Sequence, residues 1–332
     1  MQYRALGNSG INASVVGLGT WVTGGGQMWN GVDDAESLRA IEAALDAGVT
    51  LIDTAPAYGW GHSEEMIGRV IKGRRDKVVV ATKGGMWWQD KRGSYHFCID
   101  GRDLYICLRP ETLAVEVEDS LRRLGTDYID LYQMHWPSRE PDLTPICETM
   151  AFLLKLKEQG KIRAIGVSNV SVEQLAEYRS CGPVASDQFR YSMLYRAPEA
   201  DILPDCAANN TATLTYMSLE QGLLTGKVGM DRVFDPNEFR SNADWNAWFK
   251  MENRPAVLAM LAGWADLTAK YQCNLAQLVI AWTAAQPGVT HVLCGARTAG
   301  QAAQNAAAGG LVLDPADAQR MRADAVALGD PK

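Results

Sequence analysis

The sequence predicts an α/β fold, a closed (β/α)8 TIM barrel, on the strength of three observations. Eight short apolar segments alternate with segments of helical periodicity along the 332 residues. Most of the apolar segments lack polar–apolar alternation, which is typical of parallel strands covered by helices on both faces. No long polar linker divides the chain. This pattern favours a closed barrel over an open sheet, and we expect residues 1–332 to form a single domain.

The strands are expected in a simple order. Residues 3–6 and 11–14 flank the turn-rich sequence Gly7-Asn8-Ser9-Gly10, which predicts an N-terminal β-hairpin. The eight barrel strands are then expected at residues 15–18, 49–52, 78–81, 128–134, 162–167, 184–186, 212–215 and 290–294.

Apolar residues at helical spacing, such as Leu38, Ile41 and Leu45, predict helices between these strands. The same pattern recurs at 113–124, 150–154 and 175–178, and an extra C-terminal helix is expected after residue 314. Two segments, about 84–109 and 217–254, are longer than ordinary connections. Loops of such length are often functional, so we expect both to lie over the mouth of the barrel.

Charge and hydropathy exclude several classes of protein. The 39 acidic residues outnumber the 32 basic ones, and the net charge of −7 argues against binding to nucleic acid or to anionic lipid. No apolar run approaches the roughly 18 residues of a membrane span. The residues after Met1 do not resemble the apolar core of a signal peptide, so a cytoplasmic protein is expected.

The cysteines and histidines do not predict a metal site. The seven cysteines are scattered and form no Cys-x-x-Cys pair, and the four histidines lack metal-ligand spacing. Buried free thiols in a reducing cytosol, without a disulfide framework, are therefore expected.

Four residues at strand ends suggest a catalytic group. Active sites of barrels lie at the carboxyl ends of the strands, where Asp53, Lys83 and His135 occur, with Tyr58 five residues after Asp53. Each residue alone has a structural alternative, such as a helix cap for Asp53 or a core hydrogen bond for His135. A lysine ammonium near a tyrosine stabilises the phenolate and lowers its pKa from about 10, so that the phenol could donate a proton to a carbonyl. Asp53 would orient Lys83, and His135 could donate a hydrogen bond to the carbonyl oxygen. The group suits hydride transfer to an aldehyde or ketone.

Aromatic residues near the strand ends are candidates for a substrate pocket. Trp21, Trp60, Trp87 and Trp88 are close to the predicted mouth in sequence. Tryptophans also pack in cores and at rims, and that alternative stays open for each of them.

These motifs resemble those of the aldo-keto reductase superfamily, in order and over residues 3–327. The resemblance rests on Gly17-Leu18-Gly19-Thr20-Trp21, Asp53-Thr54-Ala55-Pro56-Ala57-Tyr58-Gly59 with Ser63-Glu64 and Gly68, Ser120-Leu121-Arg122-Arg123-Leu124, His135-Trp136-Pro137, Gly166-Val167-Ser168-Asn169, and Leu219 with Gly222-Leu223-Leu224-Thr225-Gly226-Lys227. The resemblance implies a hairpin that plugs the base of the barrel and a dinucleotide, NAD(P)H, that lies across the mouth.

The resemblance also implies residue roles. The catalytic tetrad would be Asp53, Tyr58, Lys83 and His135, with Tyr58 as general acid and base. The cofactor would be held by Gly19, Thr20, Trp21, Ser168, Asn169, Gln188, Tyr216, Ser218, Leu219, Gly222, Leu224, Lys227, Gly295, Arg297, Gln301, Gln304 and Asn305. Two positions depart from the family pattern: Met217-Ser218-Leu219 replaces Ser-Pro-Leu, and Gln304 stands where close relatives carry glutamate.

NADPH is the coenzyme that we expect to be preferred. The extra phosphate of NADPH needs a cation on a protein of net charge −7, and the Arg297 guanidinium can donate two parallel hydrogen bonds to it. Two other functions remain open, a Schiff-base aldolase that uses Lys83 and a non-catalytic, nucleotide-binding regulatory subunit. The substrate is expected to be a small carbonyl or alcohol, such as an aldehyde, ketone, ketose or polyol, and the sequence leaves its identity, the direction of the reaction and the oligomeric state open.

Overall fold

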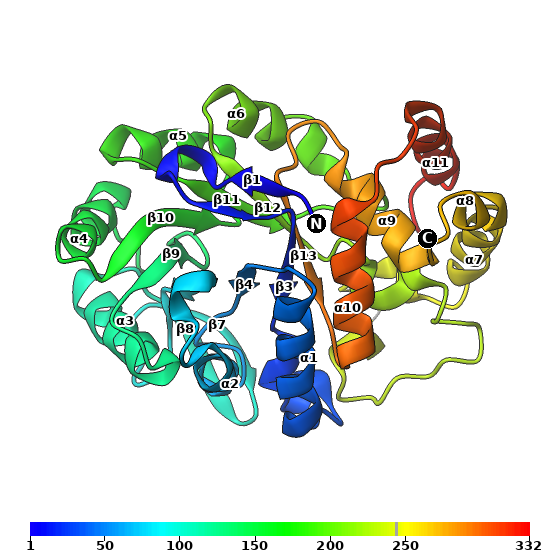
Figure 1. Ribbon diagram of the computed structural model, residues 1–332. Coiled ribbons are helices and arrows are strands. Elements are labelled where there is room, and N and C mark those ends of the chain that lie inside the picture. Colours follow the sequence, from blue (N-terminus) through cyan, green and yellow to red (C-terminus); the bar gives the residue numbers. More distant parts are fainter. Residues whose placement is uncertain (243–244) are drawn as a thin grey trace.

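A computed structural model describes residues 1–242 and 245–332, and in it eight parallel strands close into a barrel (Figure 1). Around the barrel the strands follow the order β10-β11-β12-β13-β3-β4-β5-β9. Their bounds are β3 Val16–Gly19, β4 Leu51–Asp53, β5 Val79–Gly84, β9 Ile129–Met134, β10 Ile162–Ser168, β11 Ser186–Arg190, β12 Ala212–Tyr216 and β13 His291–Gly295. The predicted (β/α)8 barrel is confirmed, although β11 begins at the end of the apolar run that predicts it.

The N-terminal hairpin closes the amino-terminal end of the barrel. Strands β1 (Tyr3–Ala5) and β2 (Asn12–Ser14) pair antiparallel. Leu6 and Ile11 between them are buried in one apolar cluster with residues from the starts of the barrel strands. Gly7 has a φ of +53°, and a Cβ there would lie 2.2 Å from the Ala185 carbonyl oxygen, so this turn requires glycine.

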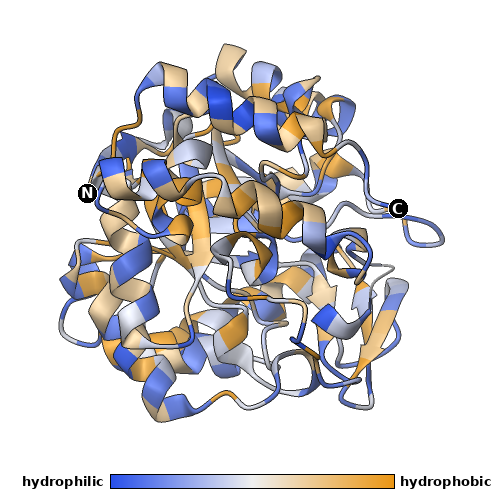
Figure 2. Ribbon diagram, turned by 90° about the vertical axis from the view of Figure 1, so that its right-hand side faces the viewer, coloured by the Kyte–Doolittle hydropathy of each residue, from blue (hydrophilic) through white to orange (hydrophobic). Residues whose placement is uncertain are grey.

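Helices surround the barrel and bury their apolar faces against it. The helices that follow the strands are α1 Asp34–Asp46, α2 His62–Ile71, α3 Pro110–Leu124, α4 Ile146–Glu158, α5 Val172–Cys181, α6 Ile202–Ala208, α9 Leu275–Ala284 and α10 Ala299–Ala307. Helix α10 packs beside α1 and completes the ring (Figure 1). Hydrophilic and hydrophobic residues alternate along the outer helices in Figure 2, as expected for helices with one face toward solvent.

Three further helices lie outside this ring, α7 Arg254–Ala262, α8 Ala265–Lys270 and the C-terminal α11 Pro315–Ala327. They share a second apolar cluster that includes Trp264, Trp282 and Met321. None of the helices in the described residues is both long enough and apolar enough to cross a membrane.

The two long segments have different structures. Instead of the expected loop, the segment after β5 forms a three-stranded antiparallel sheet in the order β6-β8-β7 (Met86–Trp87, Arg102–Ile106, Ser94–Ile99). Its exposure pattern, with Ser94 and Leu104 buried and Tyr95 exposed, shows that it packs one face on the barrel. The described part of the second segment contains only short 3-10 helices, η6 Glu220–Thr225, η7 Phe239–Ser241 and η8 Ala247–Phe249.

The expectation that all cysteines are free is wrong for two of them. Cys147 near the start of α4 and Cys181 at the end of α5 form a disulfide, with their Cα atoms 5.2 Å apart. The two helices are neighbours, and this proximity is hidden by the sequence separation of 34 between the cysteines. Among the free cysteines, Cys107, Cys206 and Cys294 are buried, whereas Cys98 is exposed and Cys273 is partly exposed.

Candidate active site

A buried lysine lies at the centre of the carboxyl-terminal mouth of the barrel. Lys83, near the end of β5, is fully buried, and its Nζ donates hydrogen bonds to Asp53 Oδ1 at 2.6 Å and to the Thr54 carbonyl oxygen at 2.8 Å. Its third contact is the Tyr58 hydroxyl at 3.3 Å. The structure therefore brings two other predicted catalytic residues, Asp53 and Tyr58, within hydrogen-bond distance of Lys83.

Tyr58 reaches this position because the loop after β4 is tightly anchored. Ser63 at the start of α2 donates to Thr20 and accepts a hydrogen bond from the Thr54 hydroxyl. Gly59, next to Tyr58, has a φ of +65°, and a Cβ there would lie 2.1 Å from the Gly24 carbonyl oxygen. A side chain at position 59 would displace this turn and with it the phenol.

Asp53 is fully occupied by hydrogen bonds. Its second oxygen, Oδ2, accepts from Gln188 Nε2 at 2.7 Å and from Gln133 Nε2 at 3.1 Å. The sequence analysis did not single out Gln133, although it points inward two residues before His135, as the period-2 pattern of a strand would indicate. Gln188, which the resemblance assigned to the cofactor, directs its amide nitrogen to Asp53.

Burial controls the protonation of Tyr58 and Lys83. Burial raises the pKa of Tyr58, and the nearby Lys83 charge counteracts this without reversing it. The expected net lowering of the Tyr58 pKa is therefore wrong, because desolvation of the phenolate outweighs the lysine charge. Burial also opposes the charge of Lys83, but Asp53 and Tyr58 together raise the pKa of Lys83 above its usual value. At neutral pH the pair is thus a protonated phenol beside an ammonium.

His135 completes the group as a neutral side chain. Its ring lies edge-on to the Tyr58 ring with centroids 5.8 Å apart. Burial, with the Lys83 charge as a second cause, lowers the pKa of His135 well below its usual value. Its Nδ1 has no hydrogen-bond partner in the part of the chain that the structure describes. A neutral imidazole can donate a hydrogen bond to a carbonyl oxygen near the phenol.

The residues predicted to hold a nicotinamide are also brought together. Asn169, with a φ of +60°, donates through Nδ2 to the His135 carbonyl and to Ser168 Oγ, each at 3.0 Å. The Tyr216 hydroxyl donates to Asn169 Oδ1 at 2.8 Å, and Ser168 donates to the Gln188 carbonyl. These contacts place Tyr216 at the mouth, next to the catalytic group.

The remaining predicted cofactor residues form two groups. Around η6, Lys227 is exposed and Leu219 and Gly222 are partly exposed, whereas Ser218 and Leu224 are buried. Leu224 packs its side chain in the second apolar cluster. Thr20 is likewise buried and donates to the Asp53 carbonyl, whereas Gly19 and Trp21 are partly exposed.

At the end of β13 and the start of α10, the second group surrounds Arg297. Gln301 accepts a hydrogen bond from the Arg297 backbone, and Asn305 donates to the Gly295 carbonyl. Gln304 is exposed and accepts from Asn274 at 3.3 Å. Arg297 Nη2 is buried without a hydrogen-bond partner among residues 1–242 and 245–332, and the guanidinium lies over the Trp29 ring at 5.4 Å.

The four predicted pocket tryptophans separate into two environments. Trp21 lies 6.4 Å from the Tyr58 ring and contacts Phe239 edge-on at 5.0 Å. Trp60 and Trp88 contact each other edge-on at 5.4 Å.

Trp87 is only 2% exposed, and its Nε1 donates to Asp90. Trp87, on β6, lines a small pocket together with Trp88 and Glu116. Trp29 and Phe239 are aromatic neighbours of Trp21 that the sequence analysis missed.

Comparison with known proteins agrees with this geometry. Residues 15–324 match the Aldo/keto reductase family. The chain belongs to this family. A protein of Escherichia coli K12 described as an NADH-specific methylglyoxal reductase is 44% identical to this aldo/keto reductase over 332 residues, which is 99% of each chain.

Solved structures of other members are also similar. The glycerol dehydrogenase AKR11B4 from Gluconobacter oxydans has a TM-score of 0.85 and 38% identity, with 99% of this chain and 96% of the other covered. An aldo/keto reductase from Klebsiella pneumoniae in complex with NADP and acetate has a TM-score of 0.70 and 27% identity, covering 97% and 94%.

The residues at the mouth fit a nicotinamide dinucleotide. The partnerless Arg297 Nη2 is a buried donor suited to an anionic group, and Tyr216 presents an aromatic ring beside the catalytic group. Hydrogen bonds connect Tyr216 through Asn169 and Ser168 to Gln188, and from Gln188 to Asp53. The donor set therefore suits the cofactor class that the family uses.

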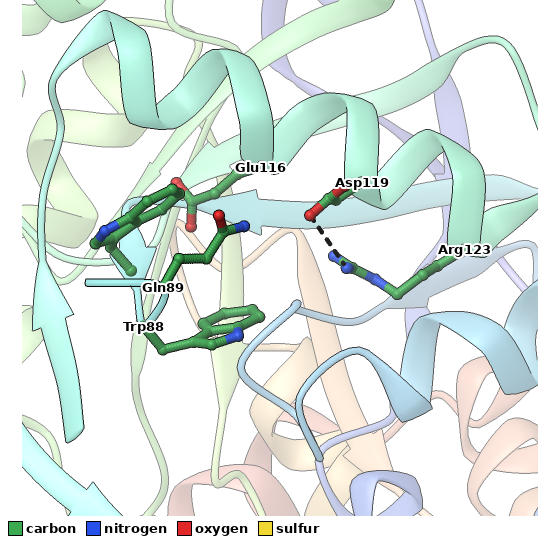
Figure 3. A pocket seen from close by; sticks show the side chains of 6 residues that line it. Trp88, Gln89, Glu116, Asp119 and Arg123 are labelled. Atoms are coloured by element: carbon green, nitrogen blue, oxygen red, sulfur yellow. Dashed lines mark ion pairs between the residues drawn. The ribbon is translucent and has the colours of Figure 1, made fainter. Parts of the chain in front are cut away.

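A second buried carboxyl holds the turn that follows Lys83. Glu116 on α3 accepts hydrogen bonds from the backbone N–H groups of Gly85 at 2.8 Å and Met86 at 3.2 Å. Figure 3 shows Glu116 between Trp88 and Gln89 on one side and α3 on the other. Burial raises the pKa of Glu116 to about 8, so the folded protein keeps this carboxyl protonated at neutral pH.

This raised pKa predicts a dependence of stability on pH. The unfolded chain ionises Glu116 above its ordinary pKa of about 4.3, whereas the folded chain does so only near 8. The contribution of Glu116 is therefore complete below about pH 4 and is lost as the pH rises toward 8, by at most ~1.4 kcal/mol per pH unit. Urea unfolding between pH 5 and 8 should show a shallower decline of the free energy of unfolding in Glu116→Gln than in the wild type. Parallel pH profiles of the two proteins would contradict the assignment.

Proposed function

We propose that the protein is a nicotinamide-dependent carbonyl reductase in which Tyr58 is the general acid and base. The observation that carries the proposal is the single buried ammonium of Lys83 in contact with both Asp53 and the Tyr58 hydroxyl. Reduction of a carbonyl requires a hydride and a proton, and this group supplies a placed proton donor. The intact group also favours an enzyme over a non-catalytic nucleotide-binding subunit, which has no use for such a donor.

The side chains divide the reaction between them. A bound NAD(P)H supplies the hydride to the carbonyl carbon. The Tyr58 O–H donates its proton to the carbonyl oxygen, and the Lys83 ammonium stabilises the phenolate that remains. Asp53 keeps Lys83 charged and aimed at the phenol, and neutral His135 donates a hydrogen bond as negative charge develops on the oxygen. In the oxidative direction Tyr58 accepts the proton of the alcohol.

A small aldehyde with an oxygen on the neighbouring carbon is the proposed substrate class. The relative from E. coli is described as a methylglyoxal reductase and the similar structure from G. oxydans as a glycerol dehydrogenase. Methylglyoxal and the aldehyde related to glycerol are three-carbon compounds with oxygens on adjacent carbons. Trp21 and Trp60, both partly exposed near Tyr58, provide flat surfaces against which such a short chain can pack.

Removal of the Tyr58 hydroxyl should test the acid. Tyr58→Phe should lower kcat for aldehyde reduction by roughly 10²–10⁴, the usual contribution of a positioned proton donor. Cofactor affinity, measured by fluorescence titration, should change little because the phenol serves the substrate. Turnover close to that of the wild type would exclude Tyr58 as the acid.

The role of Lys83 separates reduction from an aldolase reaction. The Lys83 ammonium is buried and its pKa is raised by Asp53 and Tyr58, so it is not a free amine nucleophile. Lys83→Met should abolish most reduction at neutral pH, and Asp53→Asn should weaken activity through the same contact. The wild type should yield no borohydride-fixed adduct with an aldehyde by mass spectrometry. An adduct on Lys83 would instead support the Schiff-base aldolase.

NADPH is the proposed preferred coenzyme. Arg297 is the candidate partner for its extra phosphate, because Nη2 is buried and has no partner in the described part of the chain. Burial lowers the pKa of Arg297, and the charge of Arg240 lowers it further, although Arg240 is itself paired with Glu238. The description of the relative from E. coli as NADH-specific makes the opposite preference the alternative.

Steady-state kinetics with both coenzymes will decide between them. Arg297→Ala should raise the KM for NADPH by about 10-fold, since a charge-assisted hydrogen bond contributes ~1.5–3 kcal/mol, and should change the KM for NADH far less. Arg320→Ala is a control for net charge. It removes an arginine that is paired with Asp266 and is not among the residues assigned to the cofactor. Equal losses for both coenzymes, or a wild type that prefers NADH, would show that Arg297 does not bind the phosphate.

A further inference from the structure

His96 lies beside the catalytic group but belongs to the inserted sheet. It is half-buried on β7, and its ring centroid is 5.4 Å from that of Trp136, the residue after His135. His135 in turn contacts Tyr58 edge-on at 5.8 Å. The three-stranded sheet therefore places a second imidazole against the residue that follows His135.

Arg139 fixes which ring nitrogen of His96 carries the proton. Arg139 Nη2 lies 3.0 Å from His96 Nδ1 and also donates to the Tyr95 carbonyl at 2.7 Å. A guanidinium only donates hydrogen bonds, so Nδ1 must accept and the proton of the neutral ring must be on Nε2. Burial, followed by the Arg139 charge, lowers the pKa of His96 to about 4, so the ring is neutral at neutral pH.

The Nε2–H of His96 is consequently a placed donor without a protein acceptor. No hydrogen bond joins this nitrogen to the residues that the structure describes. This nitrogen is not among the buried atoms that lack a partner, so it is open to solvent. A solvent-accessible donor beside a catalytic group is suited to a ligand, because it can exchange a hydrogen bond to water for one to a ligand oxygen. A neutral donor binds a keto or hydroxyl oxygen without requiring a charge on the substrate.

We propose that His96 Nε2–H binds the oxygen on the carbon next to the reacting carbonyl and so selects 2-oxo- and 2-hydroxyaldehydes. This inference rests on the proposed function and adds a substrate-binding residue to it. The reacting oxygen must lie within hydrogen-bond reach of Tyr58 and His135. The neighbouring oxygen is one carbon–carbon bond away, on the side where His96 borders His135 through Trp136. Arg139 acts through His96 as a positioning residue.

Three aldehydes that differ only at the second carbon provide the test, namely propanal, lactaldehyde and methylglyoxal. His96→Phe keeps a flat ring and removes the donor. The ratio of kcat/KM for lactaldehyde to that for propanal should fall about 10-fold, as expected for loss of a hydrogen bond of ~1.4 kcal/mol, and the ratio for methylglyoxal should fall likewise. Hydration of each aldehyde is the same for every variant and cancels when variants are compared.

Two further variants separate binding from structure. His96→Gln, which retains an amide donor at a similar distance from the backbone, should restore part of each ratio. Tyr95→Phe removes the hydroxyl of an exposed neighbour on the same strand and should leave the ratios unchanged.

The outcomes are distinct. Equal losses for all three aldehydes in His96→Phe would mean that the imidazole only supports the sheet, and would overturn the inference while leaving carbonyl reduction intact. A wild type without preference for lactaldehyde over propanal would overturn it as well, independently of how the variants fold. A wild type that reduces none of the three with either coenzyme would overturn the proposed function itself.

Discussion

The contact between Lys83 and Asp53 imposes the strongest constraint on this structure. Removing an ammonium and a carboxylate from water costs several kcal/mol for each ion, and the interior repays this only where the geometry is good and the remaining donors and acceptors are satisfied. Three barrel strands meet that demand. Gln133 from β9 and Gln188 from β11 donate to Asp53 on β4, while the Thr54 carbonyl accepts from Lys83. The side chains that enclose this ion pair leave the Lys83 ammonium one further contact, which is the Tyr58 hydroxyl.

A second layer of buried polar contacts supports the strand that carries Lys83. Glu64 on α2 accepts from the Thr82 hydroxyl and from Arg123, and Glu116 on α3 accepts from the turn after β5. Both carboxyls come from helices packed on the outside of the barrel, so α2 and α3 fix the two ends of a short stretch of β5. The position of the ammonium therefore depends on helix packing as well as on its own ion pair.

The sequence was sufficient to predict the barrel and the proximity of the candidate catalytic residues. The reason is that the carboxyl ends of the strands in a closed barrel converge, regardless of the loops and helices that connect them. Asp53, Tyr58 and Lys83 could be found from that rule. Gln133 could have been found from strand periodicity. His96, Trp29 and the Cys147–Cys181 disulfide could not, because each depends on how an insertion or a pair of helices packs against distant residues. The error on the Tyr58 pKa has the same origin: the sequence shows the lysine charge, but only the packed structure shows the desolvation that opposes it.

The site is assembled from parts that can vary independently. The proposed catalytic group belongs to β4, the loop after it, β5 and the residue after β9. The proposed substrate contact His96 comes from the β6-β8-β7 sheet, and the proposed phosphate contact Arg297 lies between β13 and α10. Arg297 contacts Trp29, and His96 contacts Trp136. Within residues 1–242 and 245–332, neither Arg297 nor His96 forms a hydrogen bond with Lys83 or Asp53. A change of coenzyme or of aldehyde can thus leave the ion pair intact. This separation would allow proteins of one fold to differ in coenzyme and substrate, as the descriptions of the relatives do.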